Sequence, residues 1–179
     1  MKFIAIIFLF FSVIFPSANE DEKIAWNENQ KLSWSDFKAP PKGNGFVAST
    51  SSGISFSYNF SYKETGEIID LDVSITSYFY PEKSWFITSE ASEYILKHEQ
   101  THFDISELHA RILRKKISEA SFSKNLKEEI EAIYKSVEDK RRAMQHLFDG
   151  ESDHSKIKEK ELEWEAYIAQ QIKIYERWK

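Results

Sequence analysis

The sequence contains no cysteine among its 179 residues. That absence excludes disulfide bonds, thiolate metal ligands, a cysteine nucleophile and a lipid-anchored cysteine. A basic excess is missing too, because 24 Lys and Arg residues stand against 29 Asp and Glu residues, for a formal net charge of -5. Nothing in this balance favours nucleic-acid binding, which requires a basic surface. The sequence also has no Gly-rich phosphate loop and no G-x-S-x-G motif.

The apolar run near the N-terminus, residues 3–15, is too short to span a bilayer comfortably. Lys2 precedes it, and small residues at Ser17 and Ala18 follow it, which is typical of a signal peptide. We therefore expect a signal peptide over residues 1–18, with the protein exported to the periplasm or secreted. No stable membrane insertion is expected after cleavage; the alternative is an uncleaved anchor.

The remainder, residues 19–179, has the length of a single domain, and its two halves differ in periodicity. Apolar and polar residues alternate over 54–62 and again over 69–75, with a polar turn between them, which predicts an antiparallel hairpin. Residues 19–88 are therefore expected to form a small antiparallel β-sheet.

Residues 89–179 show helical periodicity instead. We expect a first helix over about 89–117, a second that ends at a polar break over 148–155, and a third after that break. The sequence thus predicts an α+β fold: a small sheet followed by a three-helix bundle.

The first predicted helix carries the motif His98-Glu99-Gln100-Thr101-His102. Four residues along a helix turn two side chains only about 40° apart and separate them by about 6 Å, so both imidazoles can reach one ion. This H-E-x-x-H pattern is the signature of zinc metalloproteases. It predicts one Zn²⁺ per chain on His98 and His102, and a zinc-bound water from which Glu99 takes a proton as general base. The alternative interpretation is a surface helix with two solvated histidines.

A catalytic zinc needs a third protein ligand. On an unbroken helix Glu107 points about 180° away from His98, and His109 lies about 16 Å along the axis, so neither fits. Glu107 is expected to pair with Arg111 instead. His154 and His146 remain among the histidines, and we favour His154 because it lies in the polar break before the third helix.

The chain resembles a bacterial family of unknown function whose members are described as predicted secreted zinc-dependent proteases. The strongest marker is the stretch around the motif, and others lie on either side of it: residues 32–37, 48–54, 83–85, 96–107, 110–111 and 149–154, and Trp164. The resemblance implies a zincin-like metal site at His98 and His102 with Glu99 catalytic, and it supports His154 as third ligand. Phe148 departs from this pattern, which has a tyrosine there, and Ser155 stands where glycine is common.

Together these features predict an exported zinc metallopeptidase that acts on peptide or protein substrates. Two alternatives stay open: a non-catalytic envelope protein that keeps the fold as a binding or scaffold module, and an amide hydrolase acting on cell-wall peptides.

Overall fold

The computed structural model describes residues 22–43, 45–65 and 68–179. The predicted signal peptide, residues 1–18, lies outside the described residues. The described chain forms a three-stranded antiparallel sheet, a two-stranded sheet and three long helices, which confirms the predicted α+β fold. No helix in this described part is both long and apolar enough to cross a membrane.

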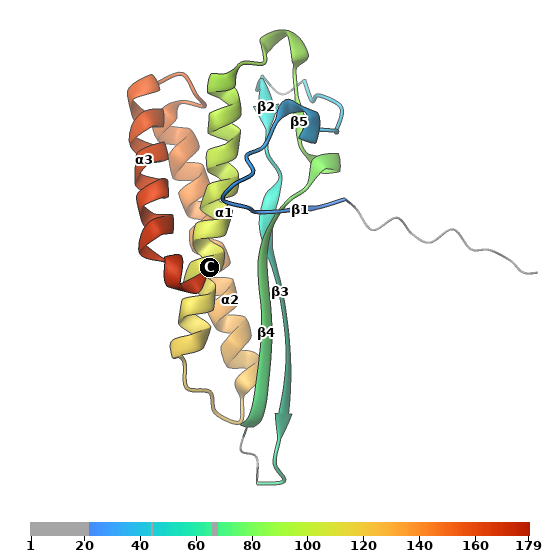
Figure 1. The fold of residues 1–179 in the computed structure, drawn as a ribbon, viewed down its shortest axis with the longest axis vertical. Helices are drawn as coiled ribbons and strands as arrows, with labels where there is room; N and C mark the ends of the chain where they lie inside the picture. Colours follow the sequence, from blue (N-terminus) through green and yellow to red (C-terminus); the bar gives the residue numbers. More distant parts are fainter. Residues whose placement is uncertain (1–21, 44, 66–67) are drawn as a thin grey trace, which may run out of the picture.

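A long hairpin dominates the larger sheet (Figure 1). Strands β3 (Ser52–Tyr62) and β4 (Ile68–Phe79) pair antiparallel, with Phe56 opposite Ile75, and the short β1 (Ile24–Ala25) adds to the other edge of β4. The smaller sheet pairs β2 (Ala48–Ser49) with β5 (Trp85–Phe86). The alternating pattern of the sequence thus becomes one face of β3 and β4 turned toward the helices.

Helix α1 (Glu93–Glu119) is the central element, because it contacts the hairpin on one side and both other helices on the other. It begins after Ser92, whose side chain accepts a hydrogen bond from the backbone N–H of Ile95. The predicted start at residue 89 is wrong, since Thr88–Glu90 forms a separate 3₁₀ turn.

Helices α2 (Leu126–Ser152) and α3 (Lys158–Ile174) complete the bundle. The predicted break over residues 148–155 is wrong at its start, because α2 continues through Ser152 and only the following five residues connect it to α3. Asp149 therefore lies on the last full turns of a helix and not in a loop. The position of Asp149 on α2 determines where its side chain lies.

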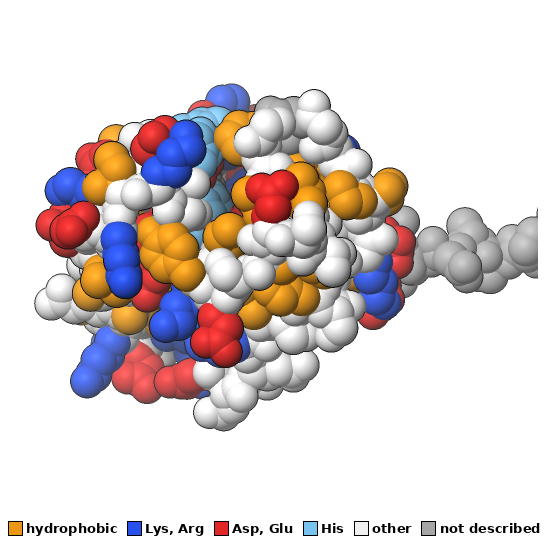
Figure 2. All heavy atoms as spheres, turned by 90° about the horizontal axis from the view of Figure 1, so that it is seen from above, with side chains coloured by type: hydrophobic (Ala, Val, Ile, Leu, Met, Phe, Trp, Pro, Cys, Tyr) orange, Lys and Arg blue, Asp and Glu red, His pale blue; other side chains and the backbone are white. Residues whose placement is uncertain are grey.

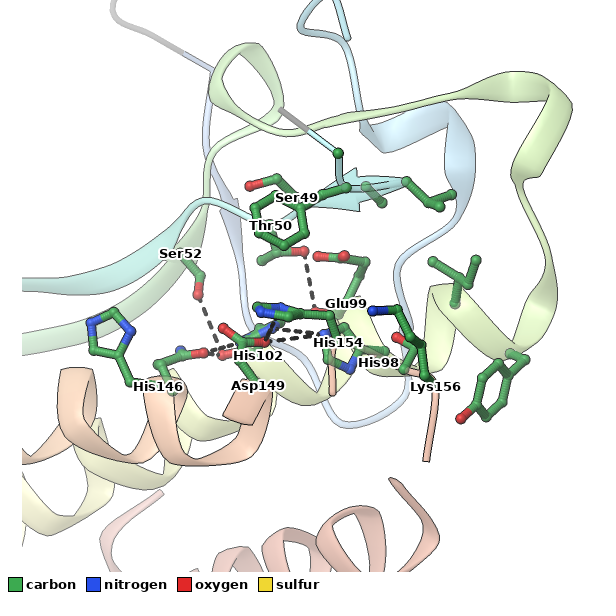
Figure 3. Close-up of a pocket in the computed structure, with 18 of the residues that line it drawn as sticks. Ser49, Thr50, Ser52, His98, Glu99, His102, His146, Asp149, His154 and Lys156 are labelled. Carbon is green, nitrogen blue, oxygen red and sulfur yellow. Dashed lines mark hydrogen bonds and ion pairs between the residues drawn. The ribbon is translucent and has the colours of Figure 1, made fainter. Parts of the chain in front are cut away.

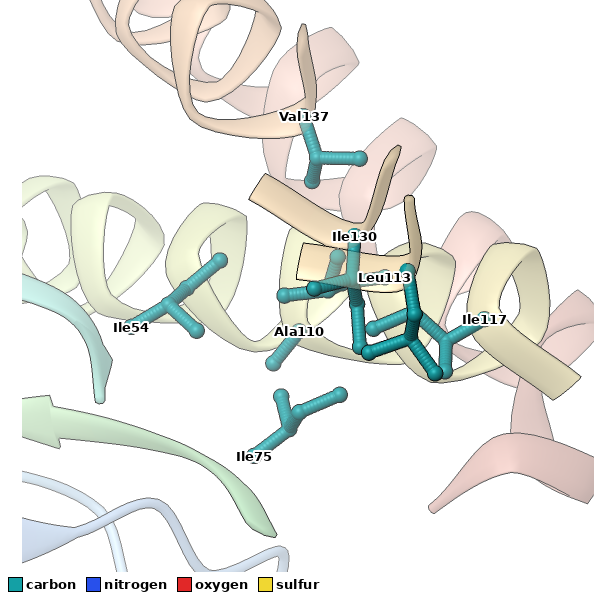
Figure 4. Close-up of a cluster of buried hydrophobic side chains, with 8 residues drawn as sticks. Ile54, Ile75, Ala110, Leu113, Ile117, Ile130 and Val137 are labelled. Atoms are coloured by element: carbon teal, nitrogen blue, oxygen red, sulfur yellow. The ribbon is translucent and has the colours of Figure 1, made fainter. Parts of the chain in front are cut away.

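The core lies between the hairpin and the face that α1 and α2 share. Figure 4 shows its buried aliphatic side chains, which come from the hairpin, α1 and α2: Ile54, Ile75, Ala110, Leu113, Ile117, Leu126, Ile130 and Val137. A second buried cluster joins α1 to α2 and α3 through Leu108, Phe148 and Trp164. These clusters fix the three helices against one another, so side chains at their ends are held at defined separations.

Polar contacts also fix α1. Glu107 accepts a hydrogen bond from Arg111 Nε at 2.8 Å, which confirms their predicted pairing. Two polar residues of α1 hold the N-terminal segment: Gln100, which lies between the motif histidines, and Asp104, two residues after His102. Gln100 Oε1 accepts from the backbone N–H of Leu32 at 2.8 Å, and Asp104 accepts from Trp26 Nε1 at 2.6 Å.

Candidate metal centre

The motif residues lie near the start of α1, at the end of the molecule where α2 ends and α3 begins (Figure 1). Seen from above in Figure 2, histidine side chains gather in a hollow at this end. The hollow is a cavity of about 710 Å³, lined by α1, α2, the segment around β2 and the turn before α3. His98 and Glu99 are each only 4% exposed. Solvated histidines on a surface helix are therefore not what the structure shows.

His98 and His102 converge on one point. Their Nε2 atoms are 3.1 Å apart, as the spacing of four residues along α1 predicts. Asp149 approaches the same point from α2, with its Oδ1 atom 3.3 Å from His98 Nε2 and 3.0 Å from His102 Nε2. Figure 3 shows the three side chains directed toward one another. Among the described residues they form the one group of three ligand atoms close enough to share an ion.

The three atoms fit a zinc ion. Ligand atoms about 2.0–2.1 Å from a tetrahedral zinc lie roughly 3.3–3.4 Å from one another. The three observed separations, 3.0, 3.1 and 3.3 Å, are close to one face of such a tetrahedron. Two imidazoles and a carboxylate are also donors that zinc accepts, and all three residues line the cavity.

Hydrogen bonds fix the opposite edge of each ring. His98 Nδ1 lies 2.6 Å from Glu161 Oε1, on α3. His102 Nδ1 is hydrogen-bonded to Gln145 Oε1, on α2, and Gln145 Nε2 donates to the backbone carbonyl of His102 at 2.8 Å. Each ring therefore has an acceptor at Nδ1 and turns Nε2 toward the shared point.

The electrostatics of the group favour a cation. Burial alone disfavours a charged ring, but hydrogen bonds with Asp149 and Glu161 outweigh burial and raise the pKa of His98 from 6.5 to about 9. Burial likewise opposes the charge of Asp149, yet hydrogen bonds with His102 and His98 hold the pKa of that carboxyl well below its usual value. The carboxylates around the two rings therefore stabilise positive charge at this point.

Glu99 lines the same cavity. Its Oε2 atom is buried and has no hydrogen-bond partner within the protein. Because an ionised carboxylate is costly to bury without partners, this atom needs a donor from outside the chain. A water molecule in the cavity is a donor of that kind.

The predicted third ligand lies beside the group. His154 Nδ1 is 3.7 Å from Asp149 Oδ1, its side chain is 43% exposed, and its ring packs on Phe46 with 4.6 Å between centroids. Its nitrogens are not among the three converging atoms, and Asp149 occupies the position that we expected for His154. His146, the alternative ligand, lines the cavity from α2.

Three residues of the site were missed at the sequence level: Gln145, Asp149 and Glu161. Gln145 and Asp149 repeat on α2 the four-residue spacing of the histidines on α1, a signal hidden by ending the helix too early. Phe148, which replaces the family's tyrosine, is fully buried and stacks on His98 with 4.5 Å between ring centroids. Phe148 packs against the His98 ring and, unlike tyrosine, has no hydroxyl.

Comparison with known sequences finds one family. The family model described as "Bacterial protein of unknown function (DUF922)" matches residues 25–155, which include the three converging ligands and Glu99. Neither a curated protein nor a solved structure matches the chain.

Proposed function

The chain belongs to this DUF922 family of bacterial proteins of unknown function, and we propose that it is an exported zinc-dependent metallopeptidase. The proposal rests chiefly on one observation: two imidazole nitrogens and one carboxylate oxygen converge within 3.3 Å of one another, beside the unpartnered oxygen of Glu99. His98, His102 and Asp149 would hold the ion. The signal-like residues 1–18 support export to the periplasm or the medium.

Bound zinc would supply a Lewis acid that polarises a substrate carbonyl and lowers the pKa of water to about 7. The protein's own part in the reaction lies with Glu99. Its free oxygen accepts the proton of a water molecule that attacks the carbonyl carbon, and the same carboxyl then donates the proton to the departing amine. Burial of Glu99 in the cavity wall keeps that oxygen away from other partners until a water arrives.

The decisive test combines metal content with hydrolysis. Purified wild-type protein is expected to hold about one zinc per chain and to cleave fluorescein-labelled casein. Glu99→Gln keeps its shape and should keep the zinc, because Glu99 is not a ligand, but hydrolysis should fall by at least about 100-fold with the loss of the base. Glu93→Gln, an exposed change on the same helix, is the matched control and should leave both unchanged.

Three other outcomes would each contradict part of the proposal. Casein cleavage at the wild-type rate in Glu99→Gln would remove Glu99 from the mechanism. Zinc binding without casein cleavage, together with release of amines from isolated cell wall, would favour an amide hydrolase of cell-wall peptides. Protein without zinc or hydrolysis would leave a non-catalytic envelope protein.

A further inference from the structure

Each histidine of the metal centre is held at its second nitrogen by a side chain from another helix. Glu161 of α3 meets His98 Nδ1, and Gln145 of α2 meets His102 Nδ1. The two partners differ in charge, since one is a carboxylate and the other an amide. Either partner can orient its ring. Only the carboxylate can also raise the basicity of the ring's other nitrogen through its charge.

The hydrogen-bond pattern determines which nitrogen of each ring carries the proton. Gln145 Nε2 already donates to the carbonyl of His102 at 2.8 Å, so Oε1 is the atom that faces the ring, and it can only accept. An ionised Glu161 can likewise only accept. Both rings therefore keep a proton at Nδ1 when a cation takes the place of the proton at Nε2, and the two Nε2 atoms lie 3.1 Å apart.

Glu161 is only half satisfied by the protein itself. Its side chain is fully buried, and its Oε2 atom has no hydrogen-bond partner. A buried carboxylate oxygen without a partner costs free energy that an apolar side chain of similar size would not. Packing therefore gives no reason for a carboxylate at this position, whereas a negative charge on the far side of a metal-binding ring raises the ring's basicity.

We propose that Glu161 and Gln145 are positioning residues of the metal centre, with Glu161 also strengthening His98 as a ligand through its charge. This inference rests on the proposed zinc site. Gln145 orients His102 without adding charge, so only His98 gains basicity from its partner. Glu161 lies beyond residue 155, where the family match ends, so α3 completes a site that begins in the matched region.

The experiment measures two properties of the full protein: zinc affinity, by competition with a chromogenic chelator, and the rise in melting temperature when zinc is added to the zinc-free protein. Glu161→Gln keeps the size and an acceptor but removes the charge, and should weaken zinc binding by about 10-fold. Glu161→Leu removes the acceptor as well and should weaken it by up to about 100-fold. In both variants the melting temperature should rise less on zinc addition than in the wild type.

Glu163→Gln is the matched control, because Glu163 is on the same helix but exposed, and it should change neither property. Wild-type zinc affinity in both Glu161 variants would overturn the inference while leaving the proposed function intact. A wild-type rise in melting temperature on zinc addition in both variants would also overturn it. A wild-type protein that binds no zinc would instead refute the proposed function, and the inference with it.

Discussion

At the scale of single residues, Asp149 connects the parts of the site. Its Oδ1 atom lies within 3.3 Å of both ligand nitrogens and 3.7 Å from His154 Nδ1. His154, by contrast, is exposed and packs on Phe46. One carboxylate oxygen therefore completes the ligand triangle, and the nearby imidazole stands at its edge.

This geometry predicts losses of zinc affinity of very different size for two alanine variants. Asp149→Ala removes a ligand and should weaken zinc binding by more than about 100-fold, since loss of an outer partner alone costs about 10- to 100-fold. His154→Ala should weaken it by less than about 10-fold. Chelator competition measures both. Greater loss in His154→Ala than in Asp149→Ala would return the third position to His154.

At the scale of elements, the turn between α2 and α3 is strained. Asp153, His154 and Ser155 have φ values of 47°, 50° and 70°, three successive left-handed residues of which none is glycine. Each such residue costs about 1–2 kcal/mol relative to its usual conformation. The turn directs the chain back over the cavity, and its cost explains physically why glycine suits the position of Ser155.

Ser155→Gly should therefore raise the free energy of unfolding by about 1 kcal/mol. Ser136→Gly is a useful comparison because Ser136 is exposed within α2, where glycine lowers helix stability by about 0.5 kcal/mol. Urea denaturation of the two variants and the wild type measures both changes. A loss of stability in Ser155→Gly would show that the serine side chain contributes more than the turn costs.

At the scale of the whole molecule, the charges of the metal centre link stability to pH. The folded pKa of His98 is about 9, above its ordinary value of 6.5, so its contribution to stability is complete below pH 6.5 and is lost as the pH rises through 9. The folded pKa of Asp149 is lowered, so its contribution is present above its ordinary value of 3.8 and is lost at more acid pH. The metal-free protein should be most stable between these limits.

Zinc should reverse the alkaline part of this dependence, because the ion replaces the proton on the rings and binds more strongly as they deprotonate. Zinc-free protein is expected to melt at a lower temperature at pH 9.5 than at pH 6.5, and added zinc should raise the melting temperature more at pH 9.5. Calorimetry of His98→Asn is the control, since that variant lacks the titrating ring. An unchanged alkaline loss in His98→Asn would assign the effect to another group.

Much of the fold followed from local patterns. Alternation in the hairpin reports which face of a strand is buried, and the observed pairing of Phe56 with Ile75 puts both on one face, as predicted. Helix boundaries did not follow from local patterns alone. The polar stretch 148–155 suggested a loop, yet α2 continues past its middle, through Ser152, and both Phe148 and Ser152 are buried.

The sequence by itself determined the pair His98 and His102 with Glu99 between them, because their geometry depends only on the pitch of one helix. Which side chains surround that pair was decided by the tertiary structure alone. Asp149 and Gln145 come from α2 and Glu161 from α3, more than 40 residues away along the chain. Periodicity tells which face of a helix is buried, but the side chains that face it depend on how the helices pack.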